Sequence, residues 1–128
     1  MTPWHHAESS ARRFGGKADD YIKIHAWFDD TKGDLPNHLH RALRHHSRGI
    51  IDAAVLFGEA ITNSVGTSVP VRLIGEQHVK EDCGFIPSVA DWLSHLSPQP
   101  WMGRVAKRSC DSGEVTIDLP PEEDFQVP

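Results

Sequence analysis

Two histidine and aspartate pairs in this 128-residue chain have the same four-residue spacing: His25 with Asp29, and His78 with Asp82. On a helix, residues four apart lie on one face, so each imidazole would lie beside its carboxylate. Both groups bind divalent cations, and the helices of a bundle can supply ligands from facing positions. The pairs therefore predict a mixed nitrogen and oxygen metal site suited to Zn, Mn or Fe(II).

The same spacing has two other interpretations. A carboxylate can accept the N–H of the imidazole and so fix its tautomer, leaving the other ring nitrogen to act as ligand or base. A histidine on an apolar face can also be a core residue satisfied by one hydrogen bond, and a pair four apart can be a plain contact on a helix surface. All three interpretations remain open at the level of sequence.

Further residues have predicted roles if the site is catalytic. The chemistry would be metal-assisted hydrolysis, with Glu76 or Asp82 as the carboxylate base. Arg12, Arg13 and Lys17 surround two glycines and predict an anion site, although the order of residues is not that of a P-loop. They suggest a phosphorylated or nucleotide substrate. Whether the protein is an enzyme is left open.

The elements that would position these residues are mostly helical. Apolar spacing and capping residues predict helices over residues 3–14, about 20–31, about 36–60, 71–83 and 88–96, with a short hairpin or irregular loop over 61–69. On the first helix the apolar face consists of Trp4, Ala7, Ala11 and Phe14, and His6, Ser10 and Arg13 lie opposite. The predicted fold is mainly α: a compact bundle of four to five helices with a small β-hairpin or irregular loop and an acidic C-terminal tail.

Charge is unevenly distributed along the chain. The formal net charge is -5, but residues 111–128 hold six acidic side chains and no Lys or Arg, so the body of the chain is almost neutral. A neutral body does not favour nucleic acid as a partner. We expect a helical domain over residues 1–102 and a Pro-containing acidic tail over 103–128, flexible or docked as one strand. The alternative function is a noncatalytic modulator that binds a protein partner through this tail and Trp101-Met102.

Cysteine usage and hydropathy indicate the compartment. Two cysteines cannot form the disulfide framework of a small secreted domain, and no run of about 18 apolar residues is present. We therefore expect a cytoplasmic protein with no membrane partner.

Several motifs together resemble a known group of proteins. They are HHAESSARRFGG (5–16), DDTK (29–32) after His25, HRALRH (40–45), IGEQHVKED (74–82), IPSV (86–89) and DWL (91–93). Over about residues 5–102 the chain resembles a family of short uncharacterised bacterial and tailed-phage proteins, a domain of unknown function. The resemblance implies a cytoplasmic protein, in a bacterial host if it is phage-encoded, and it implies no activity.

The resemblance also bears on the third metal ligand. The helical pattern over 36–60 places His46 on the apolar stripe, whereas the shared motif draws attention to His45, and to His40 as an addition. We predict His45 as the ligand and His46 as a core residue. The predicted metal ligands are His25, His45, His78, Asp29 and Asp82.

Overall fold

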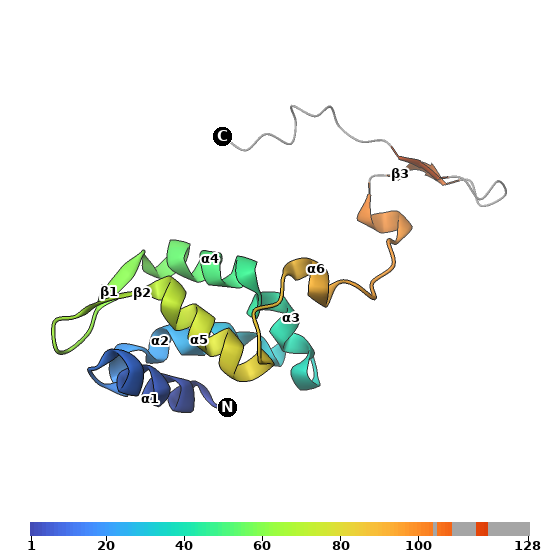
Figure 1. Cartoon of the computed structure of the whole chain (residues 1–128). Coiled ribbons are helices and arrows are strands. Elements are labelled where there is room, and N and C mark those ends of the chain that lie inside the picture. Colours follow the sequence, from blue (N-terminus) through green and yellow to red (C-terminus); the bar gives the residue numbers. More distant parts are fainter. Residues whose placement is uncertain (104, 109–114, 118–128) are drawn as a thin grey trace. The chain divides into compact units, whose positions relative to one another are not determined.

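The computed structural model describes residues 1–103, 105–108 and 115–117, and it divides into two units, Met1–Ser94 and His95–Pro128. The first unit confirms a mainly helical fold with a small antiparallel hairpin (Figure 1). Its elements are α1 (Pro3–Phe14), α2 (Ile22–Asp29), α3 (Arg41–Arg44), α4 (Ser47–Phe57), β1 (Ala60–Thr62), β2 (Ser68–Pro70), α5 (Val71–Cys83) and α6 (Val89–Trp92), with 3-10 turns at Ala18–Asp20, Asp30–Gly33 and Asn37–His40. Among the described residues, no helix combines the length and the apolarity that crossing a membrane requires.

The second unit contains a 3-10 turn at Pro100–Met102 and a separate antiparallel pair, β3 (Val105–Arg108) with β4 (Val115–Ile117). β4 lies within the acidic tail, which was expected to be flexible or docked as one strand. The rest of the acidic tail lies outside the described residues, so its predicted docking or flexibility stays a prediction.

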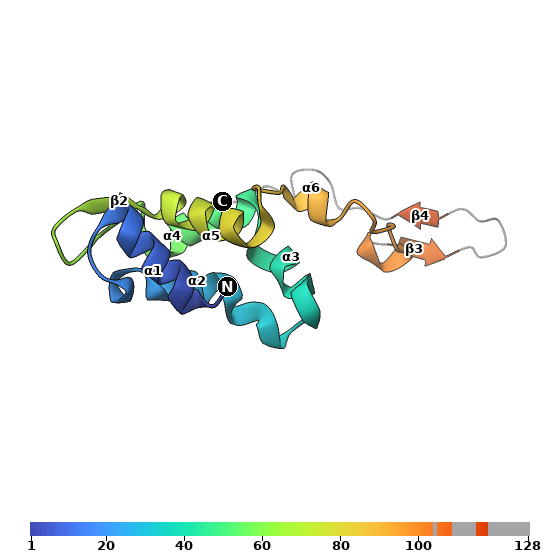
Figure 2. The ribbon, with the colours of Figure 1, turned by 60° about the horizontal axis from the view of Figure 1, so that its bottom comes forward.

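Helix α5 is the centre of the first unit. It packs against α1, α2 and α4, and the β1–β2 hairpin joins it to α4 (Figures 1 and 2). Its residues Val71, Ile74 and Val79 are buried in a core that also contains Phe28 and Ile50. Because α5 carries both His78 and Asp82, any site built on them lies at the junction of several helices.

Helix α1 buries part of the predicted apolar face, since Ala7 is buried and Ala11 and Phe14 pack against the core, together with polar residues predicted to lie opposite. His6, Ala7 and Ser10 are its buried residues, whereas Trp4 is 47% exposed. The polar side chains face inward because they find hydrogen-bonding partners on α5, as described below. The apolar pattern was therefore correct for Ala7 and wrong for Trp4, His6 and Ser10.

The single long helix predicted over residues 36–60 is also wrong. The structure breaks it into a 3-10 turn, α3 and α4, and the break falls at His45 and His46. His45 leaves the helical region with ψ 67°, and His46 is extended with φ -159° and ψ 173°. The His46 Nδ1 then accepts a hydrogen bond from the Gly49 N–H at 2.9 Å and so caps the start of α4.

Gly49 is required by this break, which gives a testable prediction. A Cβ at Gly49 would collide with the backbone carbonyl of Arg44, an atom that cannot move without displacing α3. We expect Gly49→Ala to lower the free energy of unfolding by about 1–3 kcal/mol, measured by urea denaturation. Gly33→Ala is the matched control, because nothing lies within 4 Å of its new methyl group. Equal effects of the two substitutions would contradict the proposed close approach.

The last helix of the first unit is shorter than predicted. The capping box of Ser88 and Asp91 is present, with hydrogen bonds of 3.0 and 2.8 Å. However, α6 ends at Trp92 rather than near Leu96.

Candidate metal centre

Six histidine and aspartate side chains from four places in the fold meet in the interior. They are His6 on α1, His25 and Asp29 on α2, His45 between α3 and α4, and His78 and Asp82 on α5. The side chains of His6, His25, His45 and His78 are fully buried, and those of Asp29 and Asp82 are 5% and 1% exposed. Burying so many ionisable groups together is costly unless they are paired or coordinate a cation.

Four atoms lie at the centre of this cluster: His45 Nε2, His78 Nε2, Asp29 Oδ1 and Asp82 Oδ2. The two nitrogens are 3.1 Å apart. Asp82 Oδ2 lies 2.9 Å from His45 Nε2 and 3.2 Å from His78 Nε2, and Asp29 Oδ1 lies 3.4 Å from each nitrogen. One ligand atom from each of His6, Asp29, His78 and Asp82 also lies within 4.8 Å of the other three, so His6 borders the same site. The side chains thus converge on one point from three elements.

His6 holds the other oxygen of Asp82. Its Nε2 lies 3.1 Å from Asp82 Oδ1, and its Nδ1 lies 2.8 Å from Glu81 Oε1. Although burial opposes protonation, the hydrogen bonds with the two carboxylates raise the pKa of His6. These two contacts favour the protonated form of His6 and fix the orientation of Asp82.

A chain of hydrogen bonds determines the tautomer of His78. Gln77 Nε2 donates to the His6 carbonyl and to Glu81, so Gln77 Oε1 accepts the Ser10 hydroxyl hydrogen at 2.7 Å. The Ser10 Oγ must then accept from His25 Nε2, also at 2.7 Å. This leaves His25 Nδ1 as the acceptor for His78 Nδ1 at 2.9 Å.

The consequence is that His78 Nε2 carries the free lone pair whenever the ring is neutral, and it points at the carboxylates and at His45. Burial and the neighbouring His78 and His6 rings lower the pKa of His25 to about 2, which keeps His25 a neutral acceptor. An imidazole lone pair facing two carboxylate oxygens is repelled unless a proton or a metal cation lies between them. This arrangement is typical of a metal-binding histidine whose other ring nitrogen donates a hydrogen bond that fixes the ring.

The carboxylates are held ionised. Burial alone would raise the pKa values of Asp29 and Asp82, but hydrogen bonds with His45 and His78 hold both below the usual range, and His6 adds to the effect at Asp82. Burial likewise disfavours a charged His45, yet its hydrogen bonds with Asp29 and Asp82 raise the pKa of His45. The centre of the cluster thus favours a cation, either a proton or a metal ion.

Some buried polar atoms on or beside the cluster have no hydrogen-bond partner. In the part of the chain that the structure describes, the buried side-chain atoms without a hydrogen-bond partner are Asp29 Oδ2, His45 Nδ1, His40 Nε2 and Arg41 Nε. Asp29 and His45 belong to the cluster, and Arg41 lies 3.6 Å from Asp82. Asp29 Oδ2 and His45 Nδ1 are not among the four converging atoms, so each needs a partner of its own, such as an ordered water.

The structure brings together all five predicted metal ligands, but not every residue given a role. Glu76 lies on another side of α5, in a cavity with Ser47 and Arg72, and is not part of the cluster. Arg12, Arg13 and Lys17 are exposed near the end of α1, so their predicted anion binding stays a prediction.

The other histidines have local roles. His46 is buried as the cap of α4, and His40 is buried with its Nδ1 bonded to the Asn37 carbonyl at 2.9 Å. His6 was not among the predicted ligands, because α1 was expected to turn this residue away from the core. The signal that could have found it is the pairing of His6 with Ser10 on one face of α1.

The chain of hydrogen bonds that leads through Ser10 and His25 to His78 gives a second prediction. Ser10→Ala removes the acceptor of His25 Nε2 without touching the four converging atoms. We expect metal affinity to fall about 10–100-fold, the usual effect of losing a hydrogen-bonding partner behind a ligand. The measurement is competition for the metal against a chelator of known affinity. Ser9→Ala is the control, since Ser9 bonds only to the outer oxygen of Glu81. An unchanged metal affinity in Ser10→Ala would contradict the role of this hydrogen-bond chain in orienting His78.

The comparisons with known proteins identify a family but no function. A family model described as a domain of unknown function, DUF6915, matches residues 1–102. No curated protein and no solved structure matches the chain.

Proposed function

This chain belongs to the DUF6915 family, whose function is unknown, and from the geometry of its buried cluster we propose that it binds one divalent transition-metal ion. The ligands are His45 Nε2, His78 Nε2, Asp29 and Asp82. His6 and His25 are positioning residues that orient Asp82 and His78.

One observation carries the proposal. In a tetrahedral site with bonds of about 2.0–2.1 Å, the edges between ligand atoms are about 3.3 Å long. Five edges among the four converging atoms measure 2.9–3.4 Å. Direct hydrogen bonds do not account for all of these contacts, because two ring nitrogens and two carboxylate oxygens offer few hydrogens to share. A cation at their centre would satisfy all four atoms.

The ligand chemistry narrows the choice of metal. Two imidazoles and two carboxylates, with no thiolate among them, suit Zn, Mn or Fe(II). Calcium and magnesium prefer sites made of oxygen ligands only.

The test is metal stoichiometry. Untagged protein is stripped with a chelator, reloaded with Zn²⁺ or Mn²⁺, desalted and analysed for metal content. We expect one ion per chain, lost in His78→Gln and retained in His95→Gln, a substitution of an exposed histidine in the other unit. Absence of stoichiometric metal in the reloaded wild-type protein would overturn the proposal.

Metal-assisted hydrolysis of a phosphorylated substrate is the finer proposal. It needs an open coordination position. Four protein ligands complete a tetrahedral Zn²⁺ site but leave two positions on a six-coordinate Mn²⁺ or Fe²⁺ ion. In hydrolysis, the oxygen of a water bonds to phosphorus, the ester P–O bond breaks, and the leaving oxygen takes a proton. Asp82, whose side chain is 1% exposed, borders the cavity through which a substrate would approach the site.

The metal dependence of activity tests this finer proposal. We expect the Mn²⁺ form to hydrolyse p-nitrophenyl phosphate at least tenfold faster than the Zn²⁺ form, since only the former leaves room for water. The measurement is release of p-nitrophenol by chelated and reloaded protein, with His78→Gln as the inactive control. If the Mn²⁺ form releases no more product than this variant, the protein binds its metal without hydrolytic activity on this substrate.

The alternative, a modulator acting through the acidic tail and Trp101-Met102, stays a prediction. Trp101 and Met102 lie in the second unit and are 74% and 42% exposed. The tail that would accompany them lies largely outside the described residues.

A further inference from the structure

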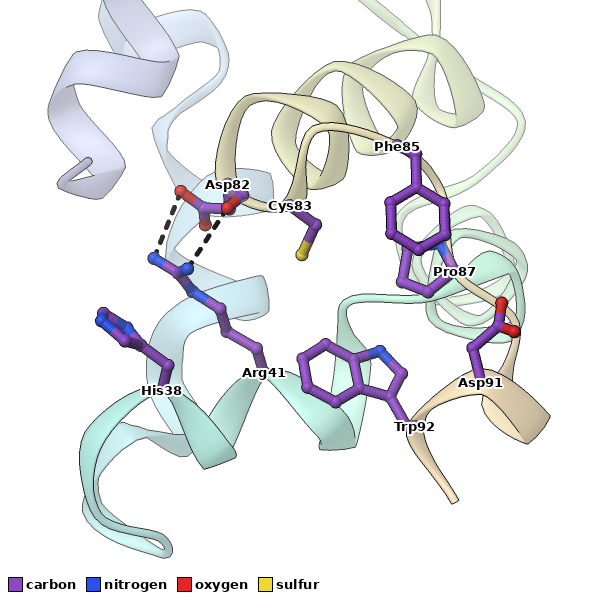
Figure 3. A pocket seen from close by; sticks show the side chains of 8 residues that line it. All are labelled: His38, Arg41, Asp82, Cys83, Phe85, Pro87, Asp91 and Trp92. Atoms are coloured by element: carbon purple, nitrogen blue, oxygen red, sulfur yellow. Dashed lines mark hydrogen bonds and ion pairs between the residues drawn. The ribbon is translucent and has the colours of Figure 1, made fainter. Parts of the chain in front are cut away.

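A cavity of about 350 Å³ lies against the outer side of Asp82. Its volume is within the usual range for sites that bind small molecules, about 300–1,000 Å³. Figure 3 shows Arg41 and Asp82 at one end of the cavity, the rings of Phe85 and Trp92 farther along it, and Asp91 beyond the rings. The cavity is thus polar at both ends and apolar between them.

The inner end offers a guanidinium group with spare hydrogen-bonding capacity. Arg41 donates to the Asp82 carbonyl at 3.3 Å and lies 3.6 Å from Asp82 Oδ1, both long contacts. Its Nε has no partner but is buried, and the side chain is 19% exposed, so a ligand would contact the terminal nitrogens. A guanidinium has five N–H donors in a planar fork that fits the oxygens of a phosphate. Arg41 is therefore suited to an anionic group that arrives through the cavity.

The middle of the cavity offers aromatic surfaces. Phe85 lines the cavity and is 56% exposed, so its ring is accessible to a ligand there. Trp92 is held in place by a 2.8 Å hydrogen bond from its Nε1 to the His45 carbonyl. Aromatic side chains bind flat rings such as nucleobases by stacking. The Asp91 carboxylate at the far end can accept a hydrogen bond from a ring amino group.

We propose that this cavity binds a nucleoside monophosphate, with its phosphate at Arg41 and its base against Phe85 and Trp92. The proposal deepens the proposed function by naming a substrate class, and it rests on that function in one respect. A bound metal neutralises Asp29 and Asp82, whose charges would otherwise repel the phosphate. Nucleotide affinity is therefore expected to be higher with metal than without it.

Titration calorimetry with adenosine 5′-monophosphate tests the proposal on the full chain, reloaded with Zn²⁺. We expect binding that is at least tenfold tighter than that of adenosine or inorganic phosphate alone, because each supplies only one half of the contacts. Phe85→Ala should weaken binding at least fivefold and leave metal content unchanged. Leu56→Ala, an exposed apolar side chain on α4 outside this cavity, is the matched control.

The outcomes separate the two proposals. If metal-loaded protein does not bind the nucleotide, or if Phe85→Ala binds it as well as wild type does, the cavity assignment is overturned while the metal site stands. If the protein holds no metal yet binds the nucleotide in a manner that depends on Phe85, the metal function is overturned and the cavity assignment is supported. Equal binding of phosphate and nucleotide would show a plain anion site and contradict the role of the rings.

Discussion

Asp82→Asn is expected to abolish metal binding and to destabilise the fold more than any other single substitution in the cluster. The side chain is 1% exposed and contacts His6, His45, His78 and Arg41. Asparagine keeps the size of the side chain but removes the negative charge that these groups share. Breaking a buried ion pair from one side costs about 3–5 kcal/mol, because the partners stay buried without compensation.

Two measurements check this expectation. Urea denaturation should give a free energy of unfolding lower by about 3 kcal/mol or more in metal-free protein, and reloaded protein should contain no metal. Asp19→Asn replaces an exposed aspartate and should change stability by less than about 0.5 kcal/mol. If Asp82→Asn retains both the metal and the stability of wild type, Asp82 is neither a ligand nor a centre of charge in this fold.

The two pairs with four-residue spacing could be predicted from the sequence because each lies within one unbroken helical stretch. Within such a stretch the geometry of side chains is local, so the side of the helix on which His78 and Asp82 lie together follows from spacing alone. What spacing does not determine is which helices bring their faces together. The meeting of α2 with α5 depends on packing around Phe28, whose ring stacks on His78 at 4.9 Å.

His45 and His6 show two different reasons why prediction from spacing fails. The choice between His45 and His46 came from a resemblance, since a continuous helix favours His46; the structure places His45 in the cluster because the helix breaks between them. Gly49, three residues after His46, was the available sign of a new helix start. His6 faces inward because it pairs with acidic groups on α5, and hydrophobic periodicity does not detect a buried polar face.

Metal loading is expected to raise the free energy of unfolding substantially. A ligand that binds only the folded state raises the free energy of unfolding by about 4 kcal/mol when its free concentration is about 1,000 times its dissociation constant. For a unit of this size, such a gain corresponds to a rise in Tm of more than about 10 °C. The measurement is thermal unfolding of chelated protein before and after addition of Zn²⁺ or Mn²⁺. Excess chelator should reverse the rise.

The controls for metal loading separate a metal centre from a purely polar network of the same residues. Protons alone can satisfy His45 and His78, and in that case the cluster is complete without metal and added Zn²⁺ leaves Tm unchanged. His78→Gln should lose the rise, whereas His95→Gln should keep it, which excludes nonspecific binding by a chain with nine histidines. Mg²⁺ should have little effect at the same concentration, because it prefers oxygen ligands and dehydrates reluctantly. A rise with Zn²⁺ that persists in His78→Gln would place the bound ion elsewhere in the protein.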